Sequence, residues 1–208
     1  MGLHTARRMG IPVRNEVFVR AAEYLLGEQE AAGPASGSAR APGWPYMKGN
    51  LNPERAKASG AMTCAGICGL LICRDECLQT RALDKAKKEK ILARLDQAIY
   101  DGLAWLDAHW SVSENPPLKT AELGYYLYGL ERAGMMAGVQ RIGTHDWYEE
   151  GAKFLTGKIA KDGADKGSWS IGKTYPKTEI QETPYALLFL RKASIRVAYA
   201  VGEAPKEP

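Results

Sequence analysis

Large apolar residues recur with helical spacing in three stretches of the chain, and the stretches share one arrangement. Residues 18–25 (FVRAAEYL), 99–106 (IYDGLAWL) and 148–155 (YEEGAKFL) align without gaps. Each has large apolar residues at its first, seventh and eighth positions, Gly or Ala at its fourth, and charged residues between them. This spacing predicts three amphipathic helices with a common apolar face. The small fourth residue predicts that a second helix approaches each face closely.

Segments of another kind separate these stretches. Residues 62–73 (MTCAGICGLLIC) carry no charge, and residues 125–133 match residues 185–193 in pattern, with charge confined to their last turns. A helix that is apolar on nearly every side must be enclosed by protein, whereas an amphipathic helix can face water. The alternation therefore predicts an all-α fold in which about three outer and inner helix pairs form two concentric layers.

Residues suited to helix starts support these boundaries. Asn15 is placed to cap the first outer helix, and Asp146 with Glu149 fits a capping box. Thr183 followed by Pro184 fits an N-cap and a first helical residue.

Two stretches rich in Gly, Pro and Ser or polar residues, 31–59 and 161–180, predict long loops. We assign residues 1–195 to one helical domain and residues 196–208 to a C-terminal tail.

The overall charge excludes some partners. The 208 residues carry 28 basic and 24 acidic side chains, a net charge of +4, which is too even to favour a nucleic-acid groove. No stretch approaches the roughly 18–20 apolar residues of a membrane span, and the N-terminus lacks the apolar core of a signal peptide. A cytoplasmic protein is therefore expected.

Four cysteines at positions 64, 68, 73 and 77 first suggest a metal site. On a helix that turns about 100° per residue, Cys64 and Cys68 share one face while Cys73 and Cys77 share nearly the opposite one. Four thiolates so arranged do not converge on one zinc ion. Buried small apolar residues are the favoured interpretation, and a metal or redox site is the alternative.

The alternation of helices, with loops that end in Gly-Trp or Gly-x-Trp, resembles the α/α-toroid repeats of the squalene-cyclase and protein-prenyltransferase superfamily. In that superfamily's Gln-Trp motif, an aromatic-Leu pair is followed by Gln and later by Gly-x-Trp. Tyr24-Leu25, Gln29 and Gly43-Trp44 are similar to this motif, with a longer loop.

Two further copies depart from the motif. Phe154-Leu155 and Gly167-Ser168-Trp169 match, but Ile159 stands in the Gln place. Trp105-Leu106 has Trp110 there and no Gly-x-Trp. The resemblance covers most of residues 1–193.

The resemblance implies a partial toroid, because about three helix pairs are about half of a full one. Leu3–Met9 would supply the last turns of one more inner helix. An incomplete toroid exposes an apolar edge, which implies self-association or a longer parent chain.

The superfamily's known chemistry finds little support in the residues. The Asp-x-Asp-Asp acid of its class II cyclases is absent, and the nearest run, Asp162–Asp165, fits a turn. The Asp, Cys and His zinc ligands of prenyltransferases have no match at His4, His109 or His145. We predict no metal and no cofactor.

Three candidates for acid/base catalysis remain. His145 and Asp146 place an imidazole beside a carboxylic acid, although capping by Asp146 explains the pair as well. Glu182 begins an inner helix, and the resemblance implies that such starts face the toroid's cavity. Apolar walls would raise its pKa and make it an acid, or it would only stabilise the helix start.

Aromatic residues of the inner helices are candidates for lining a cavity. Tyr125, Tyr126 and Tyr128 cannot all point the same way, so we expect at least one beside Tyr185 in the central space. With Cys64, Tyr125, Tyr126 and Tyr185 form the predicted lining for a hydrophobic or cationic ligand. Core packing is the alternative.

These observations predict a non-catalytic binding or scaffold module that takes a hydrophobic or isoprenoid small molecule. The alternative is an isoprenoid cyclase or prenyl transferase that acts on a hydrophobic substrate in the central cavity. A glycan-binding or glycan-cleaving groove is a third possibility, by analogy alone.

Overall fold

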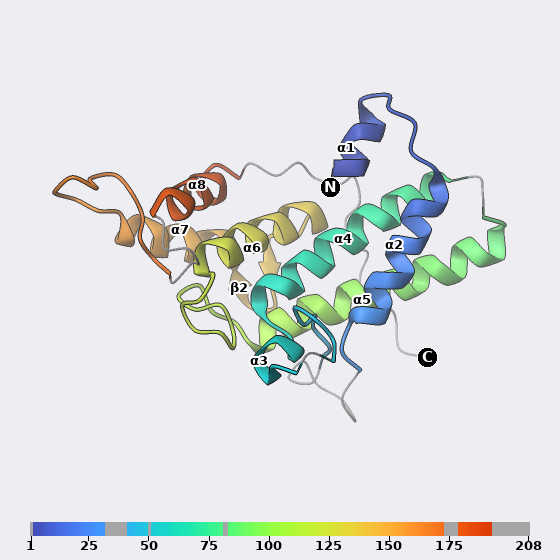
Figure 1. Cartoon of the computed structure of the whole chain (residues 1–208), viewed down its shortest axis with the longest axis horizontal. Helices are drawn as coiled ribbons and strands as arrows, with labels where there is room; N and C mark the ends of the chain where they lie inside the picture. The colour runs from blue at the N-terminus through green and yellow to red at the C-terminus, as the bar shows by residue number, and fades with distance from the viewer. Residues whose placement is uncertain (1, 32–40, 50, 81–82, 173–178, 193–208) are drawn as a thin grey trace.

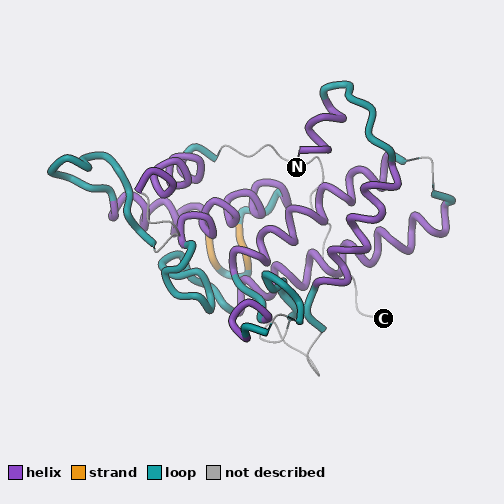
Figure 2. The backbone as a smooth tube through the Cα atoms, viewed as in Figure 1, coloured by secondary structure: helices purple, strands orange, loops and turns teal. Residues whose placement is uncertain are grey.

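The computed structural model describes residues 2–31, 41–49, 51–80, 83–172 and 179–192 (Figure 1). Two short antiparallel strands, β1 (Arg141–Ile142) and β2 (His145–Asp146), connect helices α6 and α7. The predicted all-α class is confirmed, since helices make up nearly all of the regular structure in Figure 2. In chain order the helices are α1 (Gly2–Arg8), α2 (Asn15–Glu28), α3 (Pro53–Ala56), α4 (Gly60–Gln79), α5 (Lys85–Ala108), α6 (Leu123–Ala137), α7 (Trp147–Lys158) and α8 (Glu179–Leu190).

Helix α4 is the most enclosed element. Its start is fixed by Ser59, whose hydroxyl accepts a hydrogen bond from the Met62 backbone N–H at 3.4 Å. All of residues 62–73 are buried or half-buried, because α2, α5 and α6 all pack against α4. The prediction that this charge-free segment is enclosed by protein is confirmed.

The three helices predicted to be apolar lie next to one another. Helix α6 packs against both α4 and α8, and Figure 1 shows the three in the order α4, α6, α8. The amphipathic helices pack on them: α2 and α5 against α4, and α7 against α6 and α8. Each amphipathic helix thus buries its apolar face against at least one helix of this row.

Glycine allows the close helix contacts that the sequence pattern predicts. A methyl group on Gly102 of α5 would lie 2.8 Å from the Trp44 ring and 2.9 Å from Ile67 of α4. A methyl group on Gly151 of α7 would lie 2.2 Å from the ring of Phe189 in α8. The close approach is confirmed at these two positions.

Two tryptophans make the same pair of hydrogen bonds in separate parts of the chain. The Trp44 indole N–H donates to the Leu25 carbonyl at 2.8 Å, and its backbone N–H donates to a threonine hydroxyl, Thr63 Oγ1, at 3.1 Å. The Trp169 indole N–H donates to the Leu155 carbonyl at 2.8 Å, and its backbone N–H donates to Thr183 Oγ1 at 3.0 Å. Each tryptophan therefore joins the end of an amphipathic helix to the start of an apolar one.

The observed helix starts correct two of the predicted caps. Asn15 is the first residue of α2 rather than its cap, and its side chain accepts a hydrogen bond from Arg7. Thr183 and Pro184 lie inside α8, which begins four residues before Thr183. Asp146 does cap α7, since its carboxylate accepts from the Glu149 backbone N–H at 3.0 Å.

Helix α8 is less enclosed than its sequence predicts. Phe189 and Ala186 are buried, but Ile180 and Leu187 are 78% and 53% exposed. The prediction that this helix is covered on every side is wrong, because α8 stands at the end of the row, where α6 and α7 cover one side of it. Self-association through this edge stays a prediction.

Helix α1 is attached to α4 by polar contacts. The buried carboxylate of Glu76 bonds His4 Nδ1 at 2.8 Å and accepts from the Arg7 guanidinium at 2.7 Å. No residue of α1 is itself buried. Its interpretation as the last turns of an inner helix stays a prediction.

Within the described ranges, no helix combines the length and the apolar character needed to cross a bilayer. The predicted cytoplasmic location and the division at residue 195 stay predictions, and the tail at 196–208 lies outside the described residues.

Candidate functional site

A groove of about 720 Å³ lies where α4 and α6 begin, beside the segment that contains α3. Pockets that bind small molecules have volumes of about 300–1,000 Å³, so the groove is of ligand size. Its lining mixes aromatic, aliphatic and charged side chains. The lining residues are Tyr46, Asn52, Arg55, Lys57, Ser59, Ala61, Met62, Asn115, Leu118, Ala121, Glu122 and Tyr125.

A buried asparagine holds the two helix starts together. Asn115 Oδ1 accepts from the Ala61 backbone N–H at 2.9 Å, and its Nδ2 donates to the Ala121 carbonyl at 3.0 Å. The Gly60 backbone N–H donates to the Pro116 carbonyl at 2.7 Å. The loop before α6 is thereby fixed against the start of α4, which gives the groove a rigid floor.

These bonds determine how the groove can recognise charge. The backbone N–H groups of Gly60, Ala61 and Met62 are already paired with protein acceptors. The start of α4 therefore has none of these three amides available for a phosphate or carboxylate. Recognition of an anion at this helix start falls to side chains.

Two cationic side chains lie on the α3 side of the groove. Arg55 and Lys57 are both exposed, and the Arg55 guanidinium lies 5.3 Å from the centre of the Tyr46 ring. That stacking orients the guanidinium without neutralising it. On the α6 side stands Glu122, whose backbone adopts the left-handed conformation with φ 55° and ψ 31°. A non-glycine residue in this conformation is uncommon and is found at functional sites more often than elsewhere.

An aromatic cluster extends from the groove along α6 and α8. Tyr125 lines the groove and meets Tyr185 edge-on at 5.9 Å between ring centres, while Tyr128 stacks on Tyr185 at 5.4 Å. Burial raises the pKa of the Tyr125 hydroxyl, and burial together with Glu122 and other neighbours raises that of Tyr185. The structure thus brings together the predicted lining residues Tyr125 and Tyr185.

The other two predicted lining residues lie elsewhere. Tyr126 is fully buried beneath the groove, where its hydroxyl donates to the Ser111 carbonyl at 3.0 Å. Cys64 is fully buried between α4 and α6, beside Gly129. Both pack in the core in this structure.

Glu182 lies near the aromatic cluster but is not among the groove-lining residues that the structure describes. It is 3% exposed, and its carboxylate packs against α6 where Gly124 has no side chain. A methyl group on Gly124 would lie 2.5 Å from Glu182 Oε2. The carboxylate therefore faces α6 backbone near Glu122, and a catalytic role for it stays a prediction.

The side chains of His145 and Asp146 have different partners in the structure. Asp146 caps α7, whereas His145 Nδ1 bonds Glu150 Oε1 at 3.1 Å and its ring stacks on Trp110. The Trp110 indole N–H donates to the other oxygen of Glu150 at 2.7 Å. Sequence reasoning missed the bond between Trp110 and Glu150 because it joins residues 40 positions apart.

The cysteines are buried thiols on two sides of α4. Cys68 lies close to Arg132 of α6, while Cys77 lies close to Glu76 and Lys88. Burial raises the pKa of Cys68 to about 11 and that of Cys73 to about 12, so both are protonated at neutral pH. Among the described residues, no three His, Cys, Asp or Glu side chains are grouped so that they could hold a metal ion.

The groove itself was not predicted. Its cations lie in residues 31–59, which the sequence marks as a loop, and its asparagine lies in the loop before α6. The sequence signals were Tyr125, predicted as a lining residue, and Ser59 before a charge-free helix, which predicts a capped start but not what surrounds it.

The fold and the groove define an all-α protein with a ligand-sized site at its helix starts. Comparison of the chain with protein-family models, with curated proteins and with solved structures found no match.

Proposed function

We propose that the chain is an α/α-toroid-type repeat domain whose groove binds an amphipathic anion, a molecule with an anionic head and an apolar body. The order of α4, α6 and α8, with α2, α5 and α7 packed on them, supports the toroid arrangement in two concentric layers. The equivalent hydrogen bonds of Trp44 and Trp169 support the repeat.

Gln29 supports the same proposal. In the resemblance it occupies the Gln place of the motif, and its buried amide donates to the carbonyls of Pro42 and Ala98, each at 3.1 Å. One amide thus joins the end of α2 both to the loop that leads to Trp44 and to α5. A partial toroid related to the squalene-cyclase and prenyltransferase superfamily accounts for these contacts.

The distribution of charge in the groove carries the proposal for the ligand. Arg55 and Lys57 stand on the α3 side, whereas Met62, Ala61 and Tyr125 line the side formed by α4 and α6. Cations attract a phosphate or carboxylate head, and the aliphatic and aromatic side chains favour an apolar body. A prenyl phosphate has this chemistry, because the cations Arg55 and Lys57 outnumber Glu122, the acid among the lining residues that the structure describes.

Binding without catalysis is the favoured mode, because no acid run of the cyclase type occurs in the sequence. The described residues also contain no cluster suited to a zinc ion. The alternative, an isoprenoid cyclase or prenyl transferase, would use Glu182 as its acid.

Isothermal titration with farnesyl diphosphate tests the proposal, with inorganic diphosphate and farnesol as the two halves of the probe. We expect the whole probe to bind more tightly than either half. Arg55→Gln/Lys57→Gln should weaken binding at least about 100-fold, since each charge-assisted contact contributes about 1.5–3 kcal/mol. The matched control, Lys153→Gln/Lys161→Gln, removes two exposed cations outside the groove and should bind normally.

Equal affinity of the two double variants would refute the groove as the site. Analysis of the probe after incubation separates the two candidate functions. Unchanged probe supports a binding module, whereas turnover that Glu182→Gln abolishes would establish the cyclase or transferase instead.

A further inference from the structure

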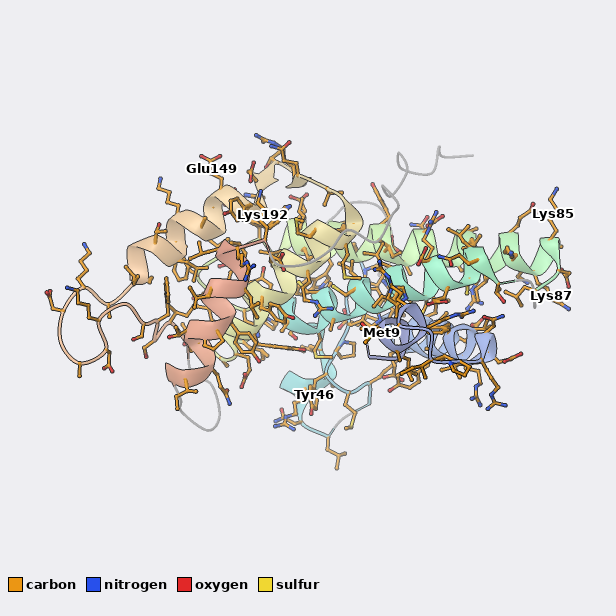
Figure 3. All side chains as sticks on the ribbon, turned by 90° about the horizontal axis from the view of Figure 1, so that it is seen from above. Met9, Tyr46, Lys85, Lys87, Glu149 and Lys192 are labelled. Atoms are coloured by element: carbon orange, nitrogen blue, oxygen red, sulfur yellow. The ribbon has the colours of Figure 1, made fainter. Side chains whose placement is uncertain are left out.

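The segment 46–57, which connects the first loop to α4, displays three large apolar side chains to solvent. Leu51 is 100% exposed, Tyr46 is 60% exposed and Met47 is 52% exposed. Figure 3 shows Tyr46 on a part of the chain that projects from the body of helices. A single exposed apolar residue is ordinary, but three on one projecting segment indicate a surface that contacts something apolar.

The segment is braced, so these side chains are held outward. Pro45 and Ala58 pair as an antiparallel bridge at its base, and the Met47 backbone N–H donates to the Arg55 carbonyl at 3.1 Å. The Ala58 backbone N–H also donates to Glu30 Oε1 at 2.7 Å. These bonds fix the backbone at the base of the segment.

Cations accompany the apolar residues. Residues 46–57 contain Lys48, Arg55 and Lys57 against the single acid Glu54, a net charge of +2. The Lys48 ammonium donates to the carbonyls of Gly27 at 2.7 Å and Gln29 at 3.1 Å, which fixes its charge at the base of the segment. The segment thus combines exposed apolar side chains with nearby cations. This combination matches the surface of an anionic bilayer, whose headgroups are negative and whose interior is apolar.

We propose that residues 46–49 and 51–57 dock the protein onto an anionic lipid bilayer, with Leu51 and Met47 inserted among the headgroups and Arg55 and Lys57 above the phosphates. Neither tip residue lines the groove, so the inference stands apart from the proposed ligand. Tyr46, Arg55 and Lys57 belong to both surfaces, which would place the mouth of the groove at the bilayer.

Sedimentation with vesicles tests this inference. The probes are vesicles of phosphatidylcholine alone and vesicles in which phosphatidylserine replaces about a third of the lipid. Each cation near an anionic membrane raises the affinity about fivefold. Two or more cations therefore predict that the wild-type protein binds the anionic vesicles at least about tenfold better than the neutral ones. Loss of this preference on adding salt should follow, because the attraction is screened.

The variant Met47→Ser/Leu51→Ser should reduce binding to the anionic vesicles about tenfold or more, through lost apolar insertion. Its matched control is Leu3→Ser/Met9→Ser, which removes two exposed apolar side chains near α1. Thermal unfolding should show that both variants are folded, and both should bind farnesyl diphosphate in solution as the wild type does.

Three results would each overturn the inference. They are no binding of the wild type to anionic vesicles, equal binding to neutral vesicles, and equal losses in the two double variants. If the wild-type protein binds neither kind of vesicle, an acidic protein surface would be the partner of this segment instead. If the wild-type protein binds anionic vesicles but does not bind farnesyl diphosphate, only the groove is refuted as a ligand site.

Discussion

Replacing Gly151 with alanine tests the close contact between α7 and α8. The new methyl group would lie 2.2 Å from Phe189 Cζ and 2.8 Å from Cε1, distances that real methyl groups do not tolerate. The Phe189 ring is fully buried and stacked on Tyr148 with 5.9 Å between ring centres, so it has little room to move. Overpacking of this kind costs about 1–3 kcal/mol.

Two effects act in opposite directions at this position. Alanine favours a helix over glycine by about 1 kcal/mol, which offsets part of the overpacking. We therefore expect Gly151→Ala to lower the free energy of unfolding by up to about 2 kcal/mol. For a chain of this size, that corresponds to a fall in Tm of up to about 8 °C.

Urea unfolding followed by circular dichroism measures the change. Gly157→Ala is the matched control, because Gly157 lies in the same helix and has no atom within 4 Å of a built methyl group. It should stabilise the protein by up to about 1 kcal/mol. Phe189→Leu in the Gly151→Ala background should recover part of the loss, which a double-mutant cycle would quantify. A Gly151→Ala protein as stable as Gly157→Ala would refute the packing.

Three further changes probe other parts of the structure. Trp44→Phe and Trp169→Phe should each lower the unfolding free energy by about 1–3 kcal/mol, because each leaves a carbonyl without its indole donor. Urea unfolding measures this loss, and variants as stable as the wild type would contradict the repeated hydrogen bonds. Asp146→Ala should lower the unfolding free energy by about 0.5–2 kcal/mol in the same assay. Asp146→Asn should lower it little, since Asn caps a helix as well as Asp does. Equal losses of stability in the two variants would contradict the capping role. The raised pKa values of Cys68, about 11, and Cys73, about 12, mean that the folded state keeps protons that the unfolded thiols release. The stability that these thiols contribute is therefore complete below about pH 9 and is lost as the pH rises toward 11–12, and urea titrations that show no decline above pH 9 would contradict it.

The sequence distinguished the apolar helices α4, α6 and α8 from the amphipathic helices α2, α5 and α7 that pack on them. This distinction was predictable because it depends on local periodicity. The absence of charge from residues 62–73 predicts enclosure wherever the rest of the chain runs. Gly102 and Gly151 likewise reveal a close contact without revealing the partner, which the structure identifies as Trp44 and Phe189.

The site could not be predicted in the same way, because its parts come from distant positions. Arg55 of α3 and Asn115 of the loop before α6 line one groove only because their segments are fixed by hydrogen bonds from the backbone N–H groups of Ala58 and Gly60. Such bonds depend on the path of the loops, which periodicity does not encode. The exposure of α8 was missed for a related reason: its apolar pattern does not show that, among the described helices, α6 and α7 pack against one side of it.

A two-dimensional NMR titration of the labelled protein with farnesyl diphosphate tests most directly where the ligand binds. The proposed function predicts shifts concentrated in residues 46–62 and 118–125, with the amides of α7 unaffected. No shifts in those two segments, or the largest shifts along the exposed side of α8 at Ile180 and Leu187, would contradict the groove as the ligand site.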